Sequence, residues 1–186
     1  MKTFEELKEE LLDRAKNANA CQNGYRMGLD AQNKADLLKA ITANWFWVLR
    51  DAKIVDAIYL EENFTEEELS EAGIYTQKCH EVRTVSFACG SATVKAYDSA
   101  TVKACGSATV KACGSATVKA YDSATVEACG SATVEAYDSA TVEAYGNSYV
   151  EDCTGNIIPK SDYAIVKDYY NHKIYIRKGK FEIIEV

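Results

Sequence analysis

The chain has 186 residues and a formal net charge of −7, with 28 acidic and 21 basic side chains. This acidic balance disfavours nonspecific binding to nucleic acid, because phosphates attract basic surfaces. No apolar run approaches the roughly 20 residues that cross a bilayer, and the charged start MKTFEELKEELL lacks the apolar core of a signal peptide. We therefore expect a cytoplasmic protein whose seven cysteines are free thiols.

Residues 1–80 have the pattern of a small helical bundle. An amphipathic stretch from about Lys34 to Ala52 places Leu37, Ile41 and Trp45 on one apolar face. Gly73 stands where a glycine would end a last short helix. Two helix starts carry the capping-box pattern of a Thr followed three residues later by a Glu, namely Thr3 with Glu6 and Thr65 with Glu68.

The densest aromatic cluster of the chain is Asn44-Trp45-Phe46-Trp47. Trp45 lies on the apolar face, whereas Phe46 and Trp47 fall away from it on a helical wheel. Either the helix is covered on several sides, or Phe46 and Trp47 form a docking patch for a partner.

From residue 89 the sequence has an octapeptide repeat, as in ACGSATVK and AYDSATVE. A period of eight fits neither an α-helix nor a heptad, while A-T-V-K-A alternates in twos and Gly-Ser or Asp-Ser supplies a corner. The pattern predicts a β-solenoid, in which short strands stack through backbone hydrogen bonds. One column of the repeat is Val94, Val102, Val110, Val118, Val126, Val134, Val142 and Val150, and it continues in degenerate form as Ile158, Val166 and Ile174.

The alternation assigns an inside and an outside to each strand. Lys95 cannot sit unpaired in a narrow core, so it must point outward. The same parity turns Ala92, Val94 and Ala96 inward and leaves Thr93 facing solvent. The solenoid is therefore expected to be slim and filled with small side chains.

The residue before each Gly or Asp bears on how many repeats make one coil. With three repeats per coil, which gives a triangular cross-section, tyrosines stack in one column and cysteines in another; two repeats per coil would mix the two types. We favour three, because stacking of like side chains stabilises ladders. The tyrosine column would be Tyr97, Tyr121, Tyr145 and Tyr169, and the cysteine column Cys105, Cys129 and Cys153.

The charged position of the repeat changes sign along the chain. It is lysine in the first four regular repeats and glutamate in the next four, so we expect a solenoid that is positive toward its N-terminal end and negative toward its C-terminal end. Such polarity could orient a partner or favour antiparallel self-association; the simpler interpretation is solvated charge. The residues are Lys95, Lys103, Lys111 and Lys119, then Glu127, Glu135, Glu143 and Glu151.

These patterns predict an α+β protein: a small helical bundle over residues 1–80, a regular octapeptide-repeat β-solenoid over 81–153, and degenerate repeats with a C-terminal β cap over 154–186. Caps are expected at both ends, because open strand edges template aggregation.

The ATV-containing octapeptides, preceded by a helical segment and followed by a Tyr/Ile/Lys-rich strand tail, resemble a family of octapeptide-repeat proteins of gut bacteria and their phages. The resemblance covers most of the chain, and it implies no activity and no catalytic residues. The chain is more distantly similar to pentapeptide-repeat proteins, some of which mimic DNA, and to bactofilins, which polymerise. It departs from both in its period of eight.

Little in the sequence points to catalysis or to a cofactor. His80 and His172 are the only histidines, and no Walker, HExxH, GxSxG or Rossmann pattern occurs. The cysteine column could hold a metal, but without a CxxC pair we expect structural thiols and no metal. We predict a protein that is not an enzyme, with no cofactor.

The expected function is a protein-binding module. The resemblance gives it a concrete form, a phage- or mobile-element-encoded inhibitor of a host defence complex, similar to an anti-CRISPR. One alternative is a structural solenoid that self-associates into homo-oligomers, and another is a DNA mimic, against which the lysine repeats argue. A membrane or a directly bound nucleic acid is not expected as a partner. The candidate partner-binding residues are Phe46, Trp47, Tyr97, Tyr121, Tyr145 and Tyr169.

Overall fold

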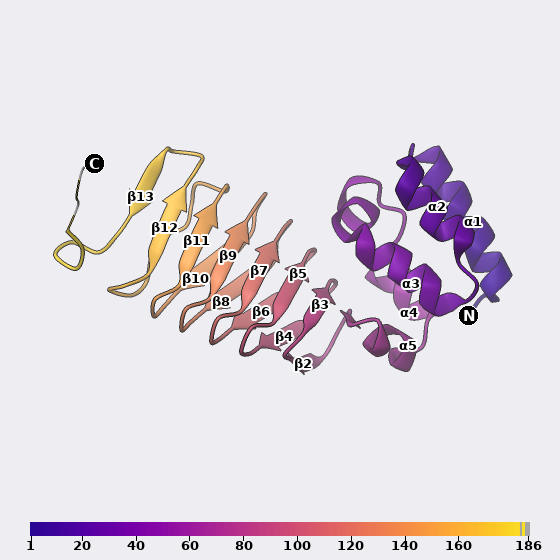
Figure 1. Cartoon of the computed structure of the whole chain (residues 1–186), viewed down its shortest axis with the longest axis horizontal. Helices are drawn as coiled ribbons and strands as arrows, with labels where there is room; N and C mark the ends of the chain where they lie inside the picture. Colours follow the sequence, from indigo (N-terminus) through magenta and orange to yellow (C-terminus); the bar gives the residue numbers. More distant parts are fainter. Residues whose placement is uncertain (183, 185–186) are drawn as a thin grey trace. The chain divides into compact units, whose positions relative to one another are not determined.

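The computed structural model describes residues 1–182 and residue 184, and it divides into two compact units, 1–76 and 77–186. The first unit is helical and the second is a β-solenoid (Figure 1), which confirms the predicted α+β class. None of the described helices is both long and apolar enough to span a bilayer.

The helical unit contains five α-helices, one π-helical segment and a very short strand. Both predicted capping boxes are present, with the Thr3 and Thr65 hydroxyls accepting from the backbone of Glu6 and Glu68. Gly73 has a φ of 70° directly after the last helix, as predicted for a helix end. The elements are α1 (Phe4–Asn17), α2 (Gln22–Asp30), α3 (Lys34–Ala43), η1 (Trp47–Asp51), α4 (Ala57–Asn63), α5 (Glu66–Glu71) and β1 (Ile74–Tyr75).

The amphipathic stretch from Lys34 to Ala52 is not one continuous helix. α3 ends at Ala43, Asn44 forms a turn, and the chain then winds into the wider η1, in which the Ala52 amide donates to the Trp47 carbonyl. A π-helical turn shifts the residues that follow it around the helix axis. Trp45 before η1 and Val48 within it are both buried, whereas Leu49 of the predicted apolar face is half-buried.

The solenoid has two sheets, with alternate strands passing to opposite sides (Figure 1). Strands β3 (Val85–Ala88), β5 (Thr101–Ala104), β7 (Thr117–Ala120), β9 (Thr133–Ala136), β11 (Tyr149–Asp152) and β12 (Ile165–Asp168) form sheet A, and β13 (Lys173–Tyr175) closes it. Sheet B consists of β2 (Cys79–Val82), β4 (Thr93–Ala96), β6 (Thr109–Ala112), β8 (Thr125–Ala128) and β10 (Thr141–Ala144).

One coil contains two repeats, not three. Thr101 pairs with Thr117 and Thr117 with Thr133, so equivalent residues stack at every second repeat. The predicted triangular coil of three repeats is therefore wrong. Its cross-section would enclose a wide centre, whereas alanine and valine fill only the narrow gap between two facing sheets at the packing density of a protein interior.

The predicted inside and outside of the strands are confirmed. Ala92, Val94 and Ala96 are fully buried, while Thr93 and Lys95 are half-buried on the outer surface. The whole valine column is buried from Val94 to Val150. The interior thus consists of small side chains, and parallel hydrogen-bonded ladders connect each coil to the next.

The corners are formed by the residue that follows Cys or Tyr. Glycines occupy the left-handed region there, and so do Asp98, Asp122 and Asp138, with φ of 56–57°. Asp tolerates this conformation better than most residues, and its carboxylate can reach the neighbouring coil: Asp122 Oδ2 accepts from the Gly106 amide at 3.0 Å. Gly130 admits no side chain without adjustment, because a Cβ would lie 2.9 Å from the Gly114 carbonyl oxygen.

The regular stacking changes at the C-terminal end of the solenoid. Val150 pairs with Val166, as predicted for a degenerate repeat, but Ile158 is exposed and its neighbour Ile157 is buried. Ile174 is also exposed, on β13, which runs antiparallel to β12. The column thus stops at Val166, because the chain reverses direction and the alternation of the octapeptide is lost.

Candidate interaction surfaces of the solenoid

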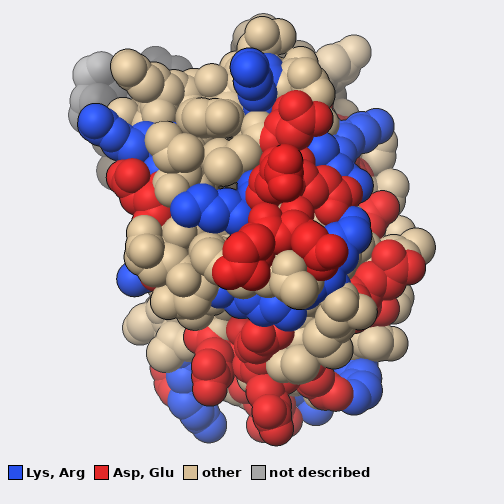
Figure 2. All heavy atoms as spheres, turned by 90° about the vertical axis from the view of Figure 1, so that its right-hand side faces the viewer, with Lys and Arg blue, Asp and Glu red and all other residues tan. Residues whose placement is uncertain are grey.

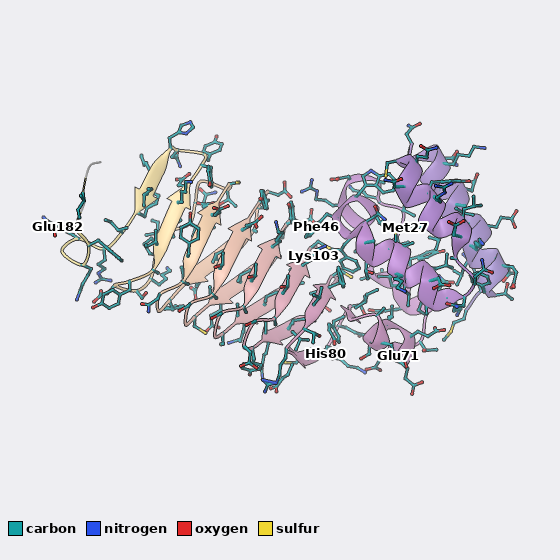
Figure 3. All side chains as sticks on the ribbon, in the orientation of Figure 1. Met27, Phe46, Glu71, His80, Lys103 and Glu182 are labelled. Carbon is teal, nitrogen blue, oxygen red and sulfur yellow. The ribbon has the colours of Figure 1, made fainter. Side chains whose placement is uncertain are left out.

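The coil of two repeats arranges the outward charges in two rows, one on each sheet. On sheet B the row is Glu81, Lys95, Lys111, Glu127 and Glu143; on sheet A it is Lys103, Lys119, Glu135, Glu151 and Lys167, with Lys103 labelled in Figure 3. Each face therefore carries two lysines followed by two glutamates. Glu81 at the start of the row on sheet B and Lys167 at the end of the row on sheet A weaken the expected polarity of charge along the solenoid.

The point of sign change is bridged on both faces. Lys111 Nζ lies 2.7 Å from Glu127 Oε2, and Lys119 Nζ lies 2.6 Å from Glu135 Oε2. These hydrogen bonds raise the pKa of both lysines. Toward the outer parts of the rows, Lys95 Nζ lies 3.4 Å from Glu81 Oε1, and Lys103, Glu143 and Glu151 are the further charges.

A row of threonines runs beside each row of charges. Thr93, Thr109, Thr125 and Thr141 occupy sheet B in register, and Thr101, Thr117 and Thr133 occupy sheet A, followed by Tyr149. Successive coils lie about 4.8 Å apart, so each face presents hydroxyls and charges at a fixed spacing. Such a rigid array can contact a surface without first having to be ordered.

The four tyrosines predicted to form one column are not brought together. Tyr97 and Tyr145 share one side of the solenoid, with Cys113 and Cys129 between them. Tyr121 and Tyr169 lie on the other side. The predicted column is wrong, because one coil contains only two repeats. The cysteine column fails for the same reason. Whether any of these tyrosines binds a partner stays a prediction.

Tyr121 instead stacks on a tyrosine that the sequence analysis did not single out. Its ring lies 4.5 Å from that of Tyr137, at an interplanar angle of 11°. The Tyr137 hydroxyl donates to Glu135 at 3.0 Å, and burial together with this bond raises its pKa. Stacking the repeats two to a coil, in place of three, would have identified the pair from the sequence.

The remaining candidate tyrosines are anchored by charged neighbours. The Arg83 guanidinium lies 5.4 Å from the ring centre of Tyr97, and the Lys167 ammonium 4.4 Å from that of Tyr169. The Tyr145 hydroxyl donates to Glu143 at 3.1 Å, which raises the tyrosine's pKa. Tyr145 and Tyr169 remain 37% and 41% exposed, so these two are the most exposed of the four candidate tyrosines.

Two buried aspartates replace inward alanines near the C-terminal end of the solenoid. Asp152 accepts from the backbone amides of Thr154, Gly155 and Ile157. Asp168 accepts from the Asn171 amide at 2.8 Å, and this bond lowers the pKa of its carboxyl group. Both carboxylates stabilise a turn where the Gly-Ser or Asp-Ser corner is missing. In the sequence, the replacement of alanine by aspartate at these repeat positions is the signal that predicts the buried carboxylates.

In the helical unit, Phe46 and Trp47 are half-buried and Trp45 is 1% exposed. Trp47 lines a small apolar pocket of about 60 Å³, together with Leu12, Gly28 and Ile41. This location favours the interpretation that the helix is covered on several sides, at least for Trp47. The binding role predicted for Phe46, labelled in Figure 3, stays a prediction.

A polar cluster joins α1 to α4 within the same unit. Glu10 forms ion pairs with Lys2 and Arg14 and accepts from the Tyr59 hydroxyl at 3.2 Å. Burial, followed by the Glu10 charge, raises the pKa of Tyr59 to about 12. On the face shown in Figure 2, acidic and basic side chains are mixed, with acidic ones gathered near the centre and along the lower edge of the view.

Among the described residues, no group of three or more His, Cys, Asp or Glu side chains is placed to hold a metal ion. His80 Nε2 lies 3.0 Å from the Gln77 carbonyl oxygen, and His172 is exposed in a turn with a φ of 56°. The described surface thus offers ordered charge, hydroxyl and aromatic groups as its main chemical features.

No protein-family model, curated protein or solved structure matches this chain. The architecture and the surface chemistry described above are therefore the basis for assigning a function.

Proposed function

We propose that this chain is a non-enzymatic protein-binding scaffold that docks through the faces of its solenoid. The observation that carries the proposal is the order of charges on each sheet, two lysines and then two glutamates in register beside a row of threonines. A rigid surface of this kind loses little conformational freedom on binding. It fits a protein partner with acidic groups opposite the lysines and basic groups opposite the glutamates.

A more specific form of this proposal is an inhibitor of a host defence complex, similar to an anti-CRISPR. Its support is the resemblance of the ATV octapeptides to repeat proteins of gut bacteria and phages. A fold supplies no function by itself, so this form depends on finding the partner.

Self-association is a second candidate, favoured by one property of the charge rows. A row of two lysines and two glutamates is complementary to itself when a second copy is turned by a half rotation. Lys95 then faces Glu143 of the other copy, and Lys111 faces Glu127, as a two-fold symmetric interface requires. The proposed DNA mimicry is less well supported, because lysines occupy two of the five positions in the row on sheet B and three of the five on sheet A.

Photo-crosslinking in a lysate of the natural host tests the main proposal. A photoreactive amino acid would replace Thr109 on sheet B or Thr117 on sheet A, and Lys39 of α3 as the control position. We expect the same protein to be captured from one solenoid face and not from Lys39. Capture from Lys39 alone would contradict docking through the solenoid.

Charge reversal provides the specificity control. Capture through sheet A should be lost when Lys103→Glu and Lys119→Glu are combined, and retained when Lys95→Glu and Lys111→Glu are combined on the other face. Phe46→Ser tests the helical unit separately. Loss of capture in this variant alone would place the contact with the partner at the segment between α3 and η1.

Sedimentation velocity at increasing concentration tests self-association. Lys95→Glu with Lys111→Glu makes the row on sheet B wholly acidic, and Glu127→Lys with Glu143→Lys makes its four regular-repeat positions basic, with Glu81 unchanged before them. Each variant alone should be monomeric, while an equal mixture should form a heterodimer. Failure of the mixture to associate, when the wild type does, would contradict the two-fold arrangement.

A further inference from the structure

Two cysteines of neighbouring coils approach each other directly on the surface of the solenoid. Cys113 follows β6 and Cys129 follows β8, and these strands pair in register up to Ala112 and Ala128. The two Sγ atoms are 2.7 Å apart, and both side chains are partly exposed. This separation is shorter than an ordinary contact between two sulfur atoms and approaches the covalent distance of about 2.05 Å.

The backbone already holds the two residues at a spacing that suits a covalent bond. Adjacent strands lie about 4.8 Å apart, within the Cα separation of about 4.4–6.8 Å found in disulfides. The Cys113 amide donates to Ala96 and the Cys129 amide to Ala112, at 2.9 and 2.8 Å. These ladder bonds do not involve the sulfurs, so a disulfide can form while they stay in place; Cys129 would give up only the 3.1 Å bond from its Sγ to the Ala112 carbonyl. We propose that Cys113 and Cys129 form a reversible disulfide that joins two successive coils.

Other cysteines are less suited to this reaction. Cys89 and Cys105 follow paired strands in the same way, but both are 2% exposed, so an oxidant in solution cannot reach them. Cys153 stacks between Tyr137 and Tyr169, and Cys21 caps α2 in the helical unit. Cys79 on β2 is exposed, but it pairs with Thr93 and not with another cysteine. The accessible pair is therefore specific to Cys113 and Cys129.

A low-molecular-weight disulfide such as oxidised glutathione is the oxidant. The thiolate of one cysteine attacks it, forming a mixed disulfide and releasing one glutathione thiolate. The second cysteine then attacks the protein sulfur of the mixed disulfide and releases the other glutathione. In sum, two protein thiols lose their protons and two electrons, one S–S bond forms, and the oxidant becomes two thiols.

The surroundings of Cys129 make this thiol a weak nucleophile at neutral pH. Burial and the hydrogen bond with Cys113 raise the pKa of Cys129 to about 11, and the neighbouring Lys111 ammonium opposes this only in part. Little of the Cys129 thiol is therefore ionised at neutral pH, so its direct attack on the oxidant is slow.

The bond would close a loop of about one coil at the place where the charge rows change sign. A cross-link over about 15 residues restricts the unfolded chain enough to raise the folding equilibrium constant about a hundredfold. The oxidised solenoid should accordingly unfold at a higher denaturant concentration than the reduced one.

Thiol counting on the full chain tests the proposal. The reduced protein is incubated with oxidised glutathione, acidified, unfolded, and alkylated with a maleimide before its intact mass is measured. We expect the oxidised monomer to lose two of its seven alkylated cysteines without gaining glutathione. Retention of all seven, stable glutathione adducts, or covalent dimers in place of the monomer would each overturn the proposal.

Variants identify the cysteines involved. Cys113→Ser and Cys129→Ser should abolish the loss of two sites, whereas Cys105→Ser, the matched control, should preserve it. The control also allows the linked peptides to be assigned. Residues 104–111 and 112–119 are identical in the wild-type sequence, and the serine at position 105 makes the two peptides distinguishable by mass. In Cys105→Ser, digestion after Lys and Glu should yield peptide 112–119 linked to peptide 128–135. A different linked pair would overturn the assignment, even if a serine variant failed to fold.

Discussion

The helical unit and the solenoid bury their apolar side chains in contrasting ways. The helical unit is held by a few large residues from distant parts of its sequence, among them Leu7, Trp45 and Phe64. In its regular repeats, the solenoid interior is built from small residues at fixed positions, such as Ala116 and Val118. The first resembles a globular core, in which each large side chain contacts several elements. The second is a series of nearly equal layers, each stabilised by its two neighbours.

This contrast predicts different responses to mutation. Loss of one large residue should affect the whole helical unit, because its elements share one core. Loss of one valine should affect the neighbouring coils most, since a residue in a stacked array contacts only adjacent layers. Both tryptophans of the chain belong to the helical unit, which makes their fluorescence a selective probe of it.

The largest effect is expected for Trp45→Ala. Truncation of this buried side chain should lower the unfolding free energy of the helical unit by about 3–5 kcal/mol. Urea unfolding followed by the fluorescence of Trp47 measures this loss, and hydrogen exchange of residues 89–152 reports on the solenoid. Equal loss of protection from hydrogen exchange in the solenoid would show that the two units unfold together, which would contradict the expectation that the two units respond separately.

Val118→Ala should cost less, about 2 kcal/mol, and its effect should be local. Val118 stacks between Val102 and Val134, so combining Val118→Ala with Val134→Ala should give a non-additive loss. The matched control combines Val102→Ala with Val134→Ala, which are separated by one coil and should be additive. Denaturant unfolding followed by circular dichroism measures both pairs; equal additivity would argue against a nearest-neighbour array.

Acid should loosen the C-terminal end of the solenoid before its regular coils. Hydrogen bonds from Asn171 lower the pKa of Asp168 below its ordinary value of 3.8. Its contribution to stability is therefore fully present above about pH 4 and is lost as the pH falls through the lowered pKa. Hydrogen exchange of residues 165–175 between pH 6 and 2.5 measures this change. Asp168→Asn should reduce the pH dependence; an unchanged profile would assign the acid sensitivity to other groups.

The smallest effect is expected for Lys119→Ala on the outer surface. The ion pair with Glu135 is partly exposed, and pairs of this kind contribute about 0.2–1 kcal/mol. The loss should shrink further in high salt, because exposed charges are screened. Thermal unfolding in low and high salt provides the measurement. A loss as large as that of Val118→Ala would mean that outward charges, and not the interior, stabilise the solenoid.

Much of the local structure follows from the sequence, because it depends on residues close together in the chain. The capping boxes at Thr3 and Thr65 and the inward alternation of Ala92, Val94 and Ala96 use contacts within a few residues. The octapeptide period likewise determines that strands and corners alternate. These features were predicted correctly for that reason.

Features that depend on the cross-section of the coil were decided by the tertiary structure. The octapeptide is compatible with two or three repeats per coil, and the choice depends on how Val94 and its equivalents fill the interior. That choice determines every partner on the surface: Tyr121 lies on Tyr137, Lys111 on Glu127, and Cys113 beside Cys129. In the regular repeats, the sequence by itself determined which residues face outward, because side chains alternate along a strand; the packing of the small interior side chains decided which of them meet.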